Sequence, residues 1–263
     1  VEFYDPMVGG DIENFFRPNT KLVFMESPGS LTFEVQDAPA IAAAANAHSI
    51  TTSLDNSWAT PLFFRPIEHG VTLSVIAATK YIVGHADAMM GFVVCDSEES
   101  YFRVRTCRNL LGHSLAPDDV YLGQRGLRTL GVRLQRHQDN ALTLADFLSA
   151  HPAVERVIHP ALPGCPGHEF WKRDFTGSSG LFSIVLVPRP RKALAAMLDN
   201  LRHFAMGFSW GGYESLIVPQ DPSATRTATN WDETGQVLRI HAGLEDPDDL
   251  LFDLEEGLTR YLR

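Results

Sequence analysis

Lysine is scarce in this sequence, and one of its four lysines has an unusual setting. Three of them, Lys21, Lys172 and Lys192, lie in polar or segment-edge contexts. Lys80 instead closely follows the apolar stretch VTLSVIAA, which is typical of a buried strand. Partial burial disfavours the charged form of an amine, and Schiff-base chemistry requires the neutral form. From this context alone a solvated strand-end cation is the commoner outcome, so both interpretations stay open.

Two nearby polar residues favour the chemical interpretation of Lys80. Thr79 places a hydroxyl beside the lysine, where it could bind a phosphate oxygen. Asp55 ends the strand-like stretch ITTSLD, where an isolated carboxylate is costly unless it is paired. The ring nitrogen of pyridoxal 5′-phosphate (PLP) is a suitable partner, and the pairing strengthens the ring as an electron sink. The alternative for Asp55 is a helix or turn cap, since Asn56-Ser57 follow.

The elements expected to position these residues alternate between apolar strands and helices, which predicts an α/β fold. Continuous apolar strands separated by helices indicate a mainly parallel sheet covered on both faces. From about residue 117 the pattern changes to a long helix and then to a smaller α+β arrangement. We therefore expect part of a large domain over 1–126 and a small C-terminal domain over 127–263. The expected strands are 20–27, 50–55, 71–78, 88–95, 154–159, 181–187 and 237–242, and the expected helices are 39–48 (capped by Asp37), 118–150, 192–203 and 247–262.

Composition excludes several classes of function. The net charge of −10 argues against a nucleic-acid partner, because binding phosphates requires a basic face. No apolar run approaches the roughly 20 residues of a membrane span, so we expect no membrane partner. Three scattered cysteines suit a reducing cytoplasm and form no zinc pattern. We also expect no metal site among the histidines, which we interpret as mostly packing or surface residues: His85, His113, His159, His168, His203 and His241.

Several segments together resemble one enzyme family over essentially the whole chain, in order and with natural spacing. The first three resemble the cofactor strands of the Cys/Met-metabolism PLP-dependent enzymes, which have fold type I. The later three resemble the bacterial cystathionine β-lyase branch of that family. Agreement of several motifs is far more specific than any single one. The segments are 54–59 (LDNSWA), 77–81 (AATKY), 84–87 (GHAD), 164–183, 208–216 (FSWGGYESL) and 238–246 (LRIHAGLED).

The resemblance implies a role for each candidate residue. Lys80 would hold PLP as a Schiff base and then remove the Cα proton of the substrate. Asp55 would pair with the ring nitrogen, and Thr79 would bind the phosphate. Arg239 would bind the substrate α-carboxylate, for which the guanidinium fork is well suited; a surface ion pair is its ordinary alternative. Ser209 and Trp210 would line the site beside the carboxylate and the lysine.

The activity implied is that of a carbon–sulfur β-lyase that converts L-cystathionine into homocysteine, pyruvate and ammonia, a reaction of methionine biosynthesis. Two alternatives stay open. The first is a γ-lyase or γ-synthase, which shares Lys80, Asp55 and Arg239. The second is a non-catalytic remnant with structural or partner-binding roles. The resemblance also implies a small sulfur amino acid as ligand, assembly as a homotetramer of two dimers, and a cytoplasmic location.

Two departures from the family pattern bear on cofactor binding. Family members often carry a serine at the position of Ala77, so one phosphate ligand is missing here. The family's glycine-containing phosphate loop, and the tyrosine that stacks on the cofactor ring, precede the segment where this sequence begins. We therefore expect the chain to be the C-terminal part of a longer enzyme, and to bind PLP weakly and turn over little by itself.

Overall fold

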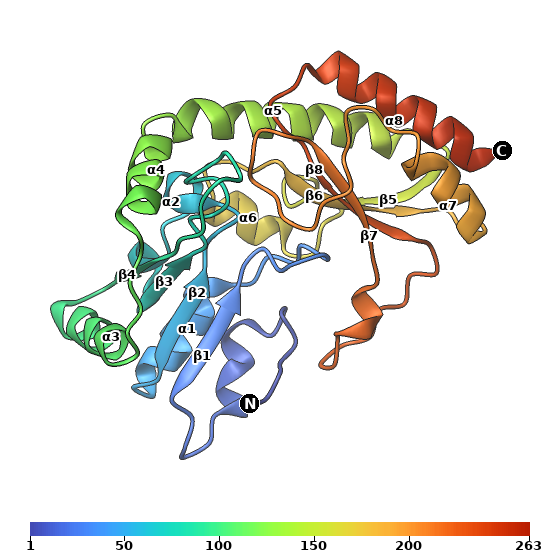
Figure 1. Cartoon of the computed structure of the whole chain (residues 1–263). Helices are drawn as coiled ribbons and strands as arrows, with labels where there is room; N and C mark the ends of the chain where they lie inside the picture. Colours follow the sequence, from blue (N-terminus) through green and yellow to red (C-terminus); the bar gives the residue numbers. More distant parts are fainter.

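The chain forms two four-stranded sheets connected by a long helix, α5 (Leu130–Ser149), in a computed structural model that describes residues 1–263 (Figure 1). The first sheet has the order β1 (Leu22–Glu26), β2 (Thr51–Asp55), β3 (Leu73–Ile76) and β4 (Phe92–Cys95). Its first three strands are parallel and β4 is antiparallel to β3. The mainly parallel sheet predicted from the apolar strands is therefore confirmed.

The second sheet is antiparallel throughout, in the order β5 (Val154–Ile158), β6 (Leu181–Leu186), β8 (Val237–His241) and β7 (Leu216–Gln220). Its central strands β6 and β8 are fully buried. Helix α8 (Pro247–Leu262) packs against α7 (Arg191–Leu198) and α5, and these helices cover one face of the sheet (Figure 1). This is the α+β arrangement expected for the C-terminal half.

Helices and short 3-10 segments fill the remaining connections. Asp37 caps α1 as predicted, because its carboxylate accepts a hydrogen bond of 3.2 Å from the backbone N–H of Ala40. None of the helices combines the length and apolar composition needed to cross a membrane. The elements are η1 (Gly9–Phe15), α1 (Ala38–Ala47), α2 (Thr60–Phe63), η2 (Pro66–His69), α3 (Glu98–Leu110), α4 (Pro117–Leu127), α6 (His168–Asp174) and η3 (Pro222–Ala224).

The buried apolar residues form two clusters, of which the first centres on the first sheet and extends to Ile158, Leu181, Val185 and Val237 of the second. The core of the first sheet also includes Leu130 and Leu134 at the start of α5, and Phe175 after α6. The core of the second sheet includes the later part of α5, from Ala141 to Leu148. We propose that the two sheets mark the two domains, 1–126 and 127–263, and that they share an interface at the start of α5.

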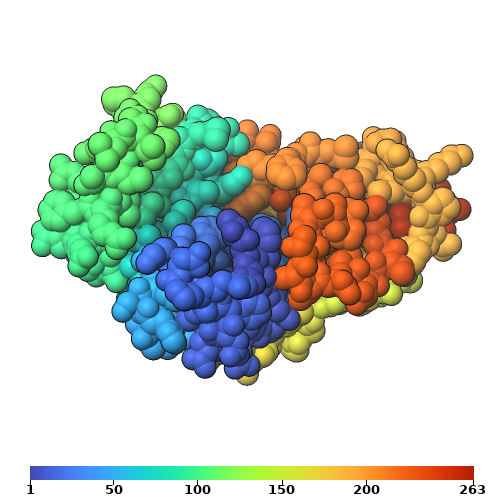
Figure 2. Space-filling view, turned by 90° about the horizontal axis from the view of Figure 1, so that it is seen from below, coloured from blue at the N-terminus to red at the C-terminus, as the bar shows by residue number.

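A second contact joins the two halves of the chain. Figure 2 shows the loop after β7 (orange) against the N-terminal segment (blue). There Arg226 donates a hydrogen bond of 2.7 Å to Glu34 and another of 3.1 Å to the hydroxyl of Thr32. The partly buried guanidinium and carboxylate thus connect the loop of one sheet to the first strand–helix connection of the other.

Three sequence-based expectations about these elements need correction. The strand expected to be buried over 88–95 is the four-residue strand β4, whose Phe92, Val93 and Val94 are 36%, 43% and 46% exposed, because β4 is an edge strand. The helix expected over 118–150 is two helices, interrupted at Arg128 and Thr129. The helix expected over 192–203 is α7, which ends at Leu198. Helices α2, α3 and α6 and strand β7 were not predicted. Helix α3 buries no residue, so it lacks the apolar stripe that periodicity detects.

Two glycines allow a close contact between α4 and the segment after β3. A Cβ atom on Gly126 would collide with the backbone carbonyl oxygen of Ile82, and one on Gly123 with the sulfur of Met90. No atom lies within 4 Å of a Cβ built on Gly131. Gly126 therefore lets α4 lie directly against the segment that follows Lys80.

We predict that Gly126→Ala lowers the free energy of unfolding by about 1–3 kcal/mol, because the new methyl group meets backbone atoms. The matched variant Gly131→Ala should be neutral or stabilise by up to about 1 kcal/mol, since alanine favours helix at an open position. Urea unfolding of both variants measures the difference. Equal effects of the two substitutions would contradict the close approach.

Candidate active site

Lys80 lies in a tight turn after β3, and this turn is held by backbone hydrogen bonds. The N–H of Lys80 donates to Ala77 at 3.1 Å, and its carbonyl accepts from Gly84 at 2.8 Å. Buried Arg133 of α5 donates to the carbonyls of Tyr81 at 2.7 Å and Ile82 at 3.2 Å. The backbone that carries Lys80 is therefore fixed from both sides, by its own sheet and by α5.

The Lys80 amine meets a loop from the second half of the chain. Its Nζ donates a hydrogen bond of 2.7 Å to the Ser209 hydroxyl and lies 5.2 Å from the centre of the Trp210 ring. It forms no ion pair. Burial lowers the pKa of Lys80, the positive charge of Arg239 lowers it further, and the Asp55 carboxylate opposes these effects. The lowered pKa increases the fraction of neutral amine, the form that a nucleophile or base requires.

Asp55 stands at the carboxyl end of β2, one strand away from the turn of Lys80. Its Oδ1 accepts a hydrogen bond of 2.9 Å from the N–H of Ser57, while Oδ2 has no hydrogen-bond partner in the chain. The Ser57 hydroxyl in turn accepts a hydrogen bond of 2.7 Å from the N–H of Ala77. Asp55 therefore caps a turn, as its ordinary alternative predicted. It also keeps one carboxylate oxygen free, as pairing with the ring nitrogen of PLP requires.

Glu26 is a second carboxylate at this edge that the sequence did not single out. It pairs with Asp55 in the register of the parallel strands β1 and β2. Burial raises the pKa of Glu26, the Asp55 carboxylate raises it too, and a hydrogen bond from Ser30 acts in the opposite direction. Their proximity could have been predicted from the sequence, because each carboxylate ends one of two parallel strands.

Arg239 lies in the centre of the second sheet, on β8, and is only 7% exposed. Its guanidinium donates to the carbonyl of Phe208, and its central carbon lies 5.1 Å from the centre of the Phe208 ring. It forms no ion pair with a carboxylate, and burial lowers its pKa. The alternative interpretation of Arg239, a surface ion pair, is therefore wrong. A buried guanidinium without a carboxylate is suited to bind one from a ligand.

Thr79 is less available for a phosphate than the sequence indicated. Its hydroxyl donates to the carbonyl of Met90 at 3.2 Å and accepts from the N–H of Met90 at 2.9 Å. The hydroxyl proton must change partner before it can serve a phosphate oxygen. The assignment of Thr79 to phosphate binding therefore stays a prediction.

A cluster of four rings lies beneath the site, and sequence reasoning named only one of its members as a site residue. Tyr81, His137, Trp210 and His241 come from four different segments, and the Tyr81 ring centre lies 5.1–5.8 Å from the other three. The sequence could have indicated His241, because it follows Arg239 by two residues and therefore lies on the same face of the strand. We return to its contacts below.

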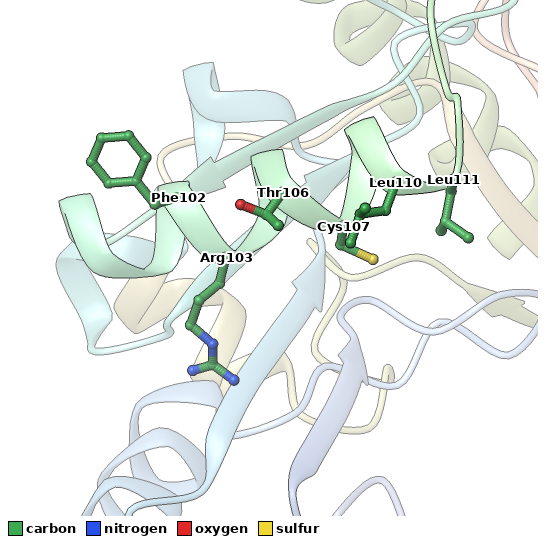
Figure 3. Close-up of a pocket in the computed structure, with 6 residues that line it drawn as sticks. All are labelled: Phe102, Arg103, Thr106, Cys107, Leu110 and Leu111. Atoms are coloured by element: carbon green, nitrogen blue, oxygen red, sulfur yellow. The ribbon is translucent and has the colours of Figure 1, made fainter.

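A separate apolar depression lies along α3 and shares no residue with the Lys80 site. Figure 3 shows that its side chains all project from this one helix and the residue after it. They are Phe102, Arg103, Thr106, Cys107, Leu110 and Leu111. With no convergent set of polar groups, this surface does not resemble a catalytic pocket.

Comparison with known proteins identifies the family. The model of the Cys/Met metabolism PLP-dependent enzymes matches residues 1–259. The chain belongs to this family. A cystathionine beta-lyase of Escherichia coli is 49% identical over 266 residues, covering 99% of this chain and 67% of the relative. An L-alanine/L-glutamate racemase of Wolbachia pipientis is 43% identical and covers 99% of this chain and 64% of that enzyme.

A solved structure shares the fold. A cystathionine gamma synthase from Xanthomonas oryzae pv. oryzae has a TM-score of 0.85 and 35% identity, covering 92% of this chain and 64% of that one. The predicted fold class, family and PLP cofactor are thereby confirmed. The chain spans about two thirds of the length of these relatives.

The residues present fit PLP. The Lys80 amine is half-buried and has no carboxylate partner, which suits a bond to an aldehyde carbon. The Asp55 carboxylate has one oxygen without a partner, and a protonated ring nitrogen can donate to it. Both groups lie within electrostatic reach of each other. A cofactor with an aldehyde at one end of a pyridine ring matches this pair.

We predict that Lys80 becomes reactive toward amine reagents at a lower pH than the other lysines, because its pKa is lowered and only the neutral amine reacts. Labelling at a series of pH values, followed by peptide mass spectrometry, gives the pH of half-maximal rate for each lysine. Lys21, Lys172 and Lys192 are internal controls. A common midpoint for all four would contradict the environment described for Lys80.

Proposed function

We propose that this protein is a PLP-dependent carbon–sulfur β-lyase that cleaves L-cystathionine with one water molecule into homocysteine, pyruvate and ammonia. The observation that carries the proposal is the match to a cystathionine beta-lyase over 99% of the chain. The placement of Ser209 and Trp210 on the Lys80 amine supports it, since both belong to the segment that resembled this branch of the family.

In this proposal each part of the site has a separate task. When bound, PLP supplies an electron sink that stabilises negative charge at the substrate Cα. Lys80 takes the proton from Cα, after which the bond between Cβ and sulfur breaks and the thiolate leaves. The Ser209 hydroxyl, 2.7 Å from Nζ, keeps the amine oriented. A neutral amine is required for this step, and the lowered pKa of Lys80 provides it.

Cofactor and substrate are held by residues of different sheets. Asp55 binds the ring nitrogen of PLP from the first sheet, and Thr79 binds the phosphate if its hydroxyl leaves Met90. Arg239 binds the substrate α-carboxylate from the second sheet, exchanging its contact with the Phe208 carbonyl for a charged partner. Trp210 covers the amine and limits its access to water.

The assembly and location of the protein are part of the same proposal. We propose a homotetramer built as two dimers, acting on a small sulfur amino acid in the cytoplasm. Family membership supports the proposed substrate class.

We predict that the purified protein supplied with excess PLP and with L-cystathionine forms pyruvate and homocysteine at a low rate, both products being identified by mass spectrometry. Lys80→Ala should abolish both products, because no other lysine lies in the site. Formation of 2-oxobutyrate instead of pyruvate would assign the protein to the γ-lyases. Conversion of L-alanine to D-alanine without pyruvate would place it with the racemase relative.

We predict that Arg239→Lys raises KM for L-cystathionine about tenfold to a hundredfold, because a charge-assisted hydrogen bond contributes about 1.5–3 kcal/mol and lysine cannot form the fork. The control is Arg156→Lys on β5, where Arg156 forms an ion pair of 2.9 Å with Glu233 outside the site. An unchanged KM in Arg239→Lys would remove Arg239 from carboxylate binding.

A further inference from the structure

His241 ends β8 and reaches the loop that covers Lys80. It is 1% exposed and lies two residues after Arg239, so both side chains project from the same face of the strand. The pairing of β8 with β6 on one side and β7 on the other fixes its position. Gly180 leaves room for it, since a Cβ there would lie 3.3 Å from Cε1 of His241.

The Nε2 atom of His241 contacts the backbone of two successive residues, Gly211 and Gly212. The N–H of Gly211 lies 3.2 Å from Nε2, and the carbonyl oxygen of Gly212 lies 3.1 Å from the same atom. In one neutral tautomer Nε2 accepts from Gly211, and in the other it donates to Gly212. Either tautomer therefore ties this turn to β8.

The tied turn lies directly against the backbone of Lys80. Gly211 has a φ of +84°, and a Cβ on it would lie 2.8 Å from the carbonyl carbon of Lys80 and 2.9 Å from its Cα. The preceding residues of the same loop are Ser209 and Trp210, which contact the amine of Lys80. His241 thus contacts the loop whose Ser209 and Trp210 lie against Nζ.

We propose that His241 is a positioning residue, whose Nε2 fixes the Gly211–Gly212 turn and thereby keeps Ser209 and Trp210 on the Lys80 amine. The consequence for the reaction rests on the proposed function, in which Lys80 is the reacting amine. The effect of His241 on the surroundings of Nζ is independent of the proposed function.

The electrostatic surroundings keep His241 neutral, as a hydrogen-bonding role requires. Burial, with smaller contributions from His137 of α5, Arg239 of the same strand and Lys80 of the opposite turn, lowers the pKa of His241 to about 3, and the contact with Gly212 opposes this shift. The ring centres of His137 and His241 are 5.1 Å apart. His241 therefore holds the turn at every pH at which the amine of Lys80 titrates, and transfers no proton itself.

The test compares His241→Leu, His241→Gln and His159→Leu in the full chain. His159 is a matched control, because it is equally buried, follows β5 and contacts Ala161 rather than the loop. We expect His241→Leu to raise the labelling midpoint of Lys80, with about tenfold less neutral amine at a fixed lower pH, since the loop opens to water. His241→Gln keeps an amide near Nε2 and should restore the midpoint. His159→Leu should lower stability to urea without moving it.

The proposal would be overturned if His241→Leu lost stability but kept the labelling midpoint of Lys80 found in the unmodified protein.

If His241→Leu does not fold, hydrogen exchange of the unmodified protein tests the proposal instead. The amide of Gly211 should exchange at least about tenfold more slowly than that of Ser209, whose N–H has no partner. Equal exchange together with an Nε2 atom that carries no proton, measured by 15N NMR, would overturn the proposal, because His241 would then bond to neither Gly211 nor Gly212. None of these measurements uses cofactor or substrate, so failure of the lyase assignment is a separate result.

Discussion

The structure depends on keeping one amine half-buried without a carboxylate beside it. A charged lysine in such a place is destabilising, and the Lys80 amine is held by a neutral hydroxyl and the face of an indole instead. Both partners come from a loop that lies 129 residues further along the chain. The reactive group therefore exists only when the two halves of the chain are packed together, which makes the interface between the sheets part of the site.

Each half supplies a different kind of contact to this interface. The parallel sheet places the carboxylates Glu26 and Asp55 at the ends of neighbouring strands. The antiparallel sheet contributes Arg239 and His241 from one face of its central strand. Helix α5 connects the halves through Arg133, which donates to carbonyls of the Lys80 turn and also to Gly126. Such donors satisfy backbone groups that would otherwise be buried without partners.

Much of this could be predicted from the sequence, and the rest could not for physical reasons. Strands near Asp55, Lys80 and Arg239 showed apolar runs because they are buried, and the resemblance supplied the roles of Ser209 and Trp210. Helix α3 gave no signal, because it buries no side chain. The exposure of β4 could not be anticipated, since an apolar run does not reveal which strand lies at an edge. The roles of Arg133 and His241 arise from contacts with residues 52 and 30 positions away, which no local pattern records.

In the proposed function, Lys80 is the lysine that binds the cofactor. The most direct test is to incubate the protein with PLP, reduce it with borohydride, digest it and locate the phosphopyridoxyl group by mass spectrometry. Borohydride converts a Schiff base into a stable amine, so the label marks the lysine that formed it. We expect the label on Lys80. Label on Lys21, Lys172 or Lys192 instead, or no label at all, would contradict it.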